Sequence, residues 1–190
     1  MYRNYHLSEL QTRIAAFDDQ LAYKELFYRF QPRLQPFVFA IVHSKEAAEE
    51  IVSDVFIRIW EKRKTLDQIH NLKLYLYVAA KNLSINYLRR EEKFQTLELS
   101  DLKVDISSID LNPQQMMMTS ETLKKIHEAI QQLPPKCKII FKLVKEDGLR
   151  QKEVAELLHI SQRTVENQLA VATKKIGKSL RFQVIDVLKN

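Results

Sequence analysis

The sequence has 190 residues, of which 45% are hydrophobic and 28% charged, and a net charge of +6. Two glycines and five prolines are too few for a fold of many short strands joined by tight turns. One cysteine excludes an intramolecular disulfide, and its apolar helical context predicts that Cys137 is a small core residue. No apolar run has the length of a membrane span, and the opening residues lack the apolar core of a signal peptide, so we expect a cytoplasmic, helical protein without membrane insertion.

Positive charge is concentrated near the C-terminus. The net charge is +2 for residues 1–92, −2 for residues 93–120 and +6 for residues 121–190. A basic C-terminal third behind an acidic stretch indicates a polyanionic partner for that third. The alternative is a basic surface that is only solvated.

Apolar residues at helical spacing predict helices from Leu7 to about Lys93. Pro32 predicts a break, and residues 64–71 are expected to form a loop that ends at Asn71, a helix N-cap. The predicted helices cover Leu7–Phe17, Leu21–Phe30, Leu34–His43, the stretch EEIVSDVFIRIWEKR, and Leu72–Arg90.

The stretch EEIVSDVFIRIWEKR has the clearest two-sided pattern. Its apolar stripe consists of Ile51, Val52, Val55, Phe56, Ile59 and Trp60, and the polar face contains Glu49, Glu50, Asp54, Arg58 and Glu61.

Residues 94–111 lack helical periodicity and are predicted to form a flexible acidic linker. Asn112-Pro113 is typical of a helix start, Pro134-Pro135 ends that helix, and Gly148 ends the next one, Pro135–Asp147. Further helices are expected at Gln151–Leu158 and Gln162–Leu180. The fold prediction is therefore all-α, with two small helical domains at residues 7–93 and 112–182.

The stretch QKEVAELLHISQRTVENQLAVATKK has the spacing of a helix-turn-helix. Val154, Ala155 and Leu158 are expected to face inward, Ile160 to fill the turn, and Ser161 to cap the second helix. Val165 and Leu169 bury that second helix. Hydrogen-bonding side chains then remain exposed at its start for base contacts, and lysines follow for phosphates: Gln162, Arg163, Glu166 and Asn167, then Lys174, Lys175 and Lys178. The alternative is a helical hairpin with merely solvated polar residues.

The longer stretch LPPKCKIIFKLVKEDGLRQKEVAELLHISQRTVENQL resembles domain four of extracytoplasmic-function (ECF) sigma factors. The resemblance implies recognition of the −35 promoter element and contact with the β flap of RNA polymerase. The DNA-binding residues that it implies are Ser161, Gln162, Arg163, Thr164, Glu166, Asn167, Lys174 and Lys175. His159 stands where the family usually has Gly in the turn. His can adopt a left-handed conformation at some cost, so we expect this turn to differ slightly from that of the family.

The stretch EAAEEIVSDVFIRIWEKR resembles the domain-two helix of sigma factors that docks on the β′ clamp helices of core polymerase. The implied core-binding residues are Glu49, Glu50, Asp54 and Arg58. Ser53 stands where the family often has Gln. From the residues alone, a solvated acidic helix face is the preferred interpretation.

NLKLYLYVAAKNLSINYLRREEK resembles the next helix of that domain, which melts and binds the −10 element. In the family, the preceding loop, here Asp67–Asn71, forms a pocket for a flipped base. Tyr75, Tyr77 and Tyr87 are candidate stacking surfaces, although at least one tyrosine is expected in the core. The implied −10 contacts are Asn71, Tyr75, Lys81, Asn82, Asn86, Arg89 and Arg90, with Asn86 where Asp is common.

The sequence thus predicts an ECF sigma factor that directs core RNA polymerase to promoters, with no catalytic residues, cofactor or metal. The motifs Leu-Pro-Pro-Lys-Cys and Thr-Val-Glu-Asn resemble the Bacteroides-type subgroup, which is often paired with a membrane-bound anti-sigma factor and an outer-membrane transporter. Two alternative functions remain. The first is a repressor with a helical sensor domain, and the second is a helical enzyme, for which a phosphate-binding Gly loop is absent and the five histidines lack metal-ligand spacing.

Overall fold

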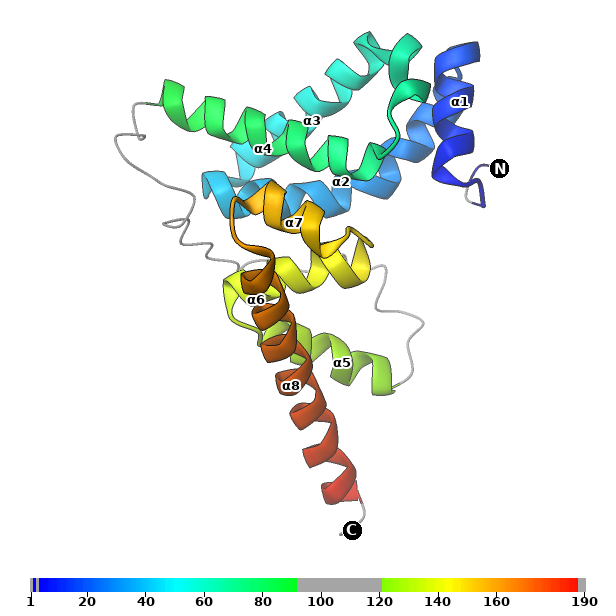
Figure 1. Ribbon diagram of the computed structural model, residues 1–190. Helices are drawn as coiled ribbons and strands as arrows, with labels where there is room; N and C mark the ends of the chain where they lie inside the picture. Colours follow the sequence, from blue (N-terminus) through cyan, green and yellow to red (C-terminus); the bar gives the residue numbers. More distant parts are fainter. Residues whose placement is uncertain (1, 3, 92–120, 188–190) are drawn as a thin grey trace. The chain divides into compact units, whose positions relative to one another are not determined.

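The computed structural model describes the backbone of residues 2, 4–91 and 121–187, and their side chains except those of 121–125 and 179–187. The chain divides into two compact units between Glu98 and Leu99. All regular elements of the described ranges are helical (Figure 1). The predicted linker and the predicted helix start at Asn112 lie outside the described residues.

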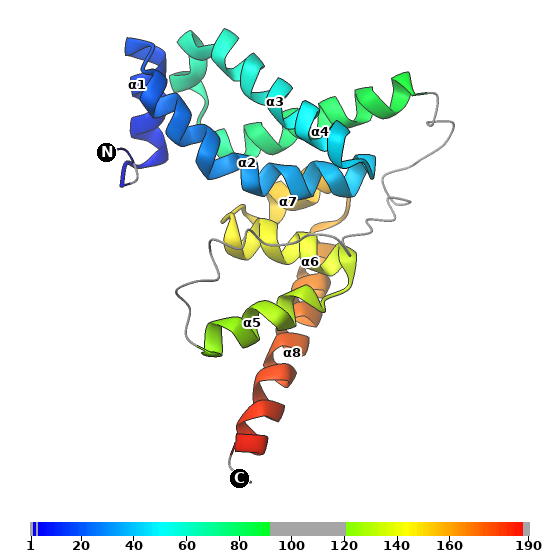
Figure 2. The ribbon, with the colours of Figure 1, turned by 180° about the vertical axis from the view of Figure 1, so that it is seen from behind.

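The first unit contains α1 (Leu7–Phe17), α2 (Gln20–Val42), α3 (Lys45–Glu61), the 3₁₀ helix η1 (Arg63–Gln68) and α4 (Leu72–Arg90). Helix α2 packs against α1, α3 and α4, α3 also packs against α4, and α1 packs against η1 (Figure 2). The core lies between these helices, and its largest fully buried side chains include Leu26, Phe56, Leu76 and Tyr77. The Tyr23 hydroxyl donates to the Phe56 carbonyl at 2.8 Å and joins α2 to α3.

Local capping signals determine where these helices begin. The Asp19 carboxylate accepts the Leu21 and Ala22 N–H groups at 3.0 Å each and caps α2. Ser44 caps α3 by accepting the Ala47 N–H at 3.2 Å. Asn71 caps α4 by accepting the Leu74 N–H at 3.1 Å, which confirms that predicted cap. Each cap satisfies backbone donors that have no partner within the helix.

The predicted break at Pro32 is wrong, because α2 runs unbroken from Gln20 to Val42 with Pro32 and Pro36 inside it. Proline removes one backbone hydrogen bond and crowds the preceding turn, which disfavours a helix interior. Apolar residues on both sides of the prolines nevertheless lie on one buried face, Leu26 and Phe30 before them and Leu34 and Val38 after Pro32. Burial of this continuous stripe against α3 and α4 offsets the local cost of the prolines.

The predicted loop over residues 64–71 is also more ordered than expected. Arg63–Gln68 forms η1, and Leu66 within it is 1% exposed. A single buried leucine among polar residues gives no periodic signal in the sequence, which is why the short helix was missed.

The second unit contains α5 (Glu121–Gln131), α6 (Pro135–Phe141), a π-helical turn η4 (Lys142–Glu146), α7 (Gln151–Leu158) and α8 (Gln162–Val187). Helices α5, α6 and α7 each pack against α8 (Figure 1). The helix predicted for Pro135–Asp147 therefore changes to π geometry at Lys142, and α8 extends beyond the predicted end at Leu180. Gly148 has a φ of 70°, in agreement with its predicted role as a helix stop.

Candidate nucleic-acid and protein interfaces

The helix-turn-helix consists of α7, a turn at His159–Ile160, and the start of α8. His159 has a φ of 52° and ends α7 in a left-handed conformation, which a histidine adopts at some cost. Val154, Ala155, Val165 and Leu169 are buried as predicted. The prediction for Leu158 is wrong, because Leu158 is half-buried while Leu157, at 2% exposure, fills the inner position.

Ser161 fixes the start of α8. Its hydroxyl accepts the Thr164 N–H at 3.0 Å and lies 2.8 Å from the Thr164 hydroxyl. This geometry confirms the predicted cap and leaves the first turn of α8 without an apolar covering, since residues 161–164 are all exposed.

Polar side chains line the exposed face of α8 after this cap. Arg163, Glu166 and Asn167 are exposed, and the Gln162 amide donates to the Glu166 carboxylate at 3.2 Å. Lys174, Lys175 and Lys178 are also exposed, further along the helix. Hydrogen-bonding groups at the helix start and cations after them form a surface suited to a major groove and its phosphates.

The N-terminus of α7 is fixed by an ion pair. The Arg150 guanidinium binds the Glu153 carboxylate at 2.6 Å, and the Glu153 carboxylate also accepts the Arg150 N–H at 2.8 Å. The hydrogen bond to Glu153 raises the pKa of Arg150. Glu153 is thereby buried with partners and holds the first turn of α7.

Cys137 lies in the core of the second unit, as predicted. Its side chain is fully buried among Ile130, Leu133 and Ala172, and its thiol donates to the Gln168 carbonyl at 3.1 Å. Burial raises the pKa of the Cys137 thiol, which favours its protonated form. Among the described side chains, no three His, Cys, Asp or Glu residues gather into a metal-binding group.

The acidic face of α3 is solvent-exposed. Glu49, Glu50, Asp54 and Arg58 all lie on it. Glu49 accepts a hydrogen bond from the Gln35 amide at 3.1 Å, which joins it to α2. The Ser53 hydroxyl donates to the Glu49 carbonyl at 2.8 Å, so this side chain bonds back to its own helix.

Ile57 lies on the same α3 face and was missed in the sequence. It is 54% exposed, three residues after Asp54 and therefore adjacent to it on the helix surface. An apolar side chain exposed beside carboxylates is the kind of residue that anchors a protein interface. The sequence does indicate this exposure, because Ile57 falls outside the apolar stripe of the helix that contains it.

Helix α4 presents a second polar face. Tyr75, Asn82, Asn86 and Arg89 or Arg90 recur at intervals of seven, four and three or four residues, which places them along one side of the helix. Asn82, Asn86, Arg89 and Arg90 are exposed, and Tyr75 is half-buried. Tyr87 is half-buried too.

Two of the predicted α4 candidates lie in the core. Tyr77 is 1% exposed and packs edge-on against Phe37 with ring centroids 5.0 Å apart, so Tyr77 is the core tyrosine that was expected. Lys81 is 6% exposed, and burial lowers the pKa of its ammonium. Lys81 is thus separated from the exposed polar face of α4, because its position on the helix faces the neighbouring helices.

The segment before α4 contributes exposed Asp67 and His70. Asn71 itself is half-buried, and its side-chain oxygen accepts the hydrogen bond that caps α4.

Among the described residues, no helix is both long and apolar enough to cross a membrane.

Comparison with known proteins matches both units to one family. Residues 26–94 match the model of sigma-70 region 2, and residues 123–176 match the model of sigma-70 region 4. The chain is similar to the RNA polymerase sigma-H factor of Pseudomonas aeruginosa, at 23% identity over 86% of this chain and 88% of that protein. It is also similar to the ECF RNA polymerase sigma factor SigW of Bacillus subtilis, at 22% identity over 86% of this chain and 91% of that protein.

A solved structure shares the fold. The sigma factor RpoE of Bartonella quintana, crystallised in complex with the anti-sigma factor NepR, matches with a TM-score of 0.52 and 19% identity, covering 84% of this chain and 96% of that one. The family models, the ECF relatives and the two helical units agree with the sequence prediction. The chain therefore belongs to the sigma-70 family, as a sigma factor of the ECF type that directs core RNA polymerase to promoters.

Proposed function

We propose that three exposed surfaces of the chain each bind a different partner. The α3 face (Glu49, Glu50, Asp54, Ile57 and Arg58) binds the β′ clamp helices of core polymerase. The α4 face, with the segment Asp67–Asn71 before it, binds melted −10 DNA. The start of α8 binds the −35 duplex. The functional domains correspond to residues 7–93 and 112–182, joined by residues 94–111.

The observation that best supports this proposal is the exposed start of α8. Ser161 caps the helix, α7 packs beside it, and Arg163, Glu166 and Asn167 are exposed while the intervening Val165 is buried. Such a helix start points its side chains at base edges when it enters a major groove.

In the −10 region, the exposed amides of Asn82 and Asn86 are suited to hydrogen bonds with unpaired bases. Arg89 and Arg90 follow on the same face and supply phosphate contacts. The buried Lys81 contributes to this surface only if α4 rearranges, so the proposal assigns the contacts to the exposed residues.

Sigma factors in general are non-enzymatic initiation factors, and we assign no catalytic step to this chain: polymerase supplies the nucleotide chemistry. Its place of action is the cytoplasm, where polymerase and promoter DNA are. The motifs Leu133–Cys137 and Thr164–Asn167 support assignment to the Bacteroides-type subgroup. The Bartonella sigma factor of similar fold forms a complex with an anti-sigma factor, which supports an anti-sigma partner for this chain, membrane-bound in that subgroup.

The test is transcription in vitro by core polymerase over a library of promoter fragments. We expect the full chain to select a subset of promoters with a shared −35 and −10 sequence, and core polymerase alone to select none. A chain that binds duplex DNA by itself but gives core polymerase no promoter preference would instead be a regulator of the repressor type.

A further inference from the structure

Helix α1 lies outside residues 26–94, the part of the first unit that matches sigma-70 region 2. It nevertheless makes a buried polar contact with the segment that leads to α4. Gln11 of α1 is 8% exposed, and its side-chain amide donates to the Leu66 carbonyl at 3.0 Å and to the Ile69 carbonyl at 2.9 Å. One amide nitrogen thus joins α1 to two points of a segment more than fifty residues later in the chain.

These two carbonyls bracket the end of η1. The Ile69 N–H also donates to the Leu66 carbonyl at 3.2 Å, so residues 66–69 form a closed turn whose outer side contains exposed Asp67. His70, also exposed, follows directly. Because the Gln11 amide occupies the inner side of this turn, it restricts the positions that Asp67 and His70 can adopt.

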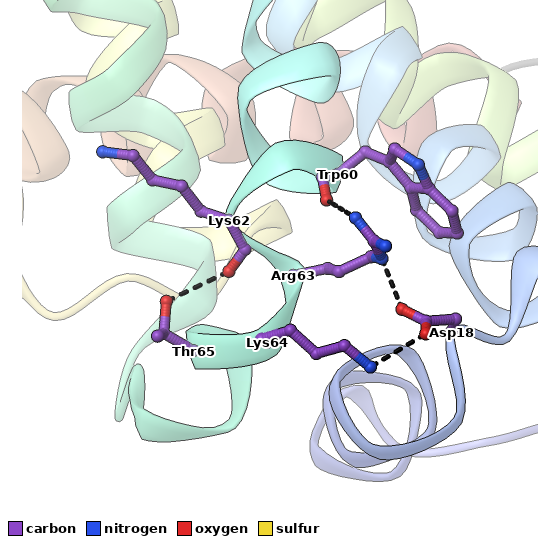
Figure 3. A network of polar contacts seen from close by, with 6 residues as sticks. All are labelled: Asp18, Trp60, Lys62, Arg63, Lys64 and Thr65. Carbon is purple, nitrogen blue, oxygen red and sulfur yellow. Dashed lines mark hydrogen bonds and ion pairs between the residues drawn. The ribbon is translucent and has the colours of Figure 1, made fainter.

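The start of η1 is joined to α1 by a second set of contacts, shown in Figure 3. The Asp18 carboxylate accepts a hydrogen bond from the Arg63 guanidinium and one from the Lys64 ammonium, the latter at 2.8 Å. Arg63 also donates to the Trp60 carbonyl at 2.9 Å and stacks on the Trp60 ring, 4.6 Å from its centroid. The bonds from Lys64 and Arg63 lower the pKa of Asp18, which means that they favour its charged carboxylate.

We propose that α1 positions the −10-reading segment Asp67–Asn71, and that Gln11 is the positioning residue. The inference rests on the proposed role of that segment in −10 recognition. Gln11 itself touches no DNA in this proposal. It acts through the backbone of Leu66 and Ile69, while Asp18 anchors the beginning of η1, so that the exposed side chains meet an unpaired base in one fixed geometry.

The experiment compares two variants of the full chain that disturb α1 in different ways. Gln11→Met keeps the length and bulk of the side chain but removes both donated hydrogen bonds. Ile14→Val removes one methylene from a fully buried α1 residue and leaves the Gln11 contacts in place, so it controls for a general loosening of α1. Asp67→Ala and His70→Ala test the segment itself.

Two measurements are made on each variant. The first is hydrogen exchange in the peptide that covers residues 66–71. The second is the −10 discrimination of the reconstituted holoenzyme, defined as the rate of open-complex formation on the preferred promoter divided by the rate on promoters with single −10 substitutions. Affinity for core polymerase is measured alongside, and a positioning role predicts that this affinity does not change.

We expect Gln11→Met to speed exchange in this peptide and to lower −10 discrimination by about threefold to tenfold, the effect of losing one or two net hydrogen bonds. Ile14→Val should change discrimination by less than about twofold. Equal effects of the two variants, or unchanged exchange in Gln11→Met, would overturn the positioning role while the segment's own role stands. If Asp67→Ala and His70→Ala both leave discrimination unchanged, the proposed −10 function of the segment fails, and the inference fails with it.

Discussion

Arg163 and Lys174 lie on the same helix and are both exposed, but they lie at different distances from the Ser161 cap. Arg163 is in the first turn of α8, two residues after Ser161, where a recognition helix meets base edges. Lys174 is about three turns further along, where the helix leaves the groove and phosphates are the available partners.

Replacing Arg163 by Ala should therefore weaken binding to the preferred −35 sequence by about 1–3 kcal/mol and binding to other sequences much less. Lys174→Ala should weaken binding to all sequences alike and reduce the salt slope by about one unit. Affinity of the holoenzyme for matched and scrambled −35 promoters over a salt series measures both effects. The same uniform loss for both variants would contradict base reading by Arg163.

Ile57 tests the proposed polymerase surface. Because it is 54% exposed, Ile57→Ser should leave the free energy of unfolding within about 0.5 kcal/mol of its original value. If Ile57 is covered by polymerase, loss of its apolar contact should weaken core binding by about tenfold. Leu21→Ser is a matched control, since Leu21 is 60% exposed on α2 and outside the proposed surface. Affinity for core polymerase is measured by fluorescence titration. Equal affinities of the two variants would refute the role of Ile57.

At the scale of elements, α2 holds two prolines that its packing tolerates. Pro32 is exposed and has no backbone N–H to donate, so Pro32→Ala removes a helix-interior cost without disturbing the core. We expect the free energy of unfolding to rise by about 1–3 kcal/mol, since the greater chain entropy of the unfolded variant offsets part of the gain.

Pro135 provides the control for this prediction, because it lies in the first turn of α6, where a missing N–H costs little. Pro135→Ala should leave stability nearly unchanged. Urea unfolding followed by circular dichroism, and by the fluorescence of Trp60 for the first unit, gives both values. An unchanged midpoint for Pro32→Ala would mean that the helix does not gain its missing hydrogen bond at this position.

At the scale of the whole molecule, two units allow two steps of initiation to be separated. Asn82 and Asn86 are exposed on α4 in the first unit, whereas the proposed core-binding face is on α3 and the recognition helix α8 belongs to the second unit. The double variant Asn82→Ala, Asn86→Ala should fold normally, bind core polymerase normally and retain −35 binding.

Open-complex formation by this double variant should fall by roughly tenfold or more, because each lost base contact is worth about 1–3 kcal/mol. Permanganate footprinting of the melted region measures the effect. Lys174→Ala serves as the comparison, since it should weaken the initial complex without altering the fraction of bound promoters that melt. Normal melting by the double variant would remove these two residues from the −10 surface.

Sequence alone determined the helices whose caps and apolar periodicity lie within one or two turns of each other in the chain. Leu7–Phe17 and Leu72–Arg90 were predicted with the ends that the structure has, because their apolar period and, for the second helix, the Asn71 cap lie within a short stretch of the chain. The helix-turn-helix was equally predictable, since Ser161 and the buried Val154 and Val165 follow from local spacing.

Tertiary structure alone decided features for which the local sequence allows more than one outcome, such as whether a helix breaks or a charged side chain is buried. Pro32 favours a helix break, and only the burial of Leu34 and Val38 against neighbouring helices keeps α2 continuous. The sequence around Gln11 does not indicate its role, because the two carbonyls that accept its hydrogen bonds belong to the distant residues 66 and 69. The sequence predicts that Lys81 is a DNA-binding cation, whereas the packing of α4 buries it. Burial and long-range hydrogen bonds depend on residues far apart in the chain, and a periodic pattern records only which residues are apolar, not what covers them.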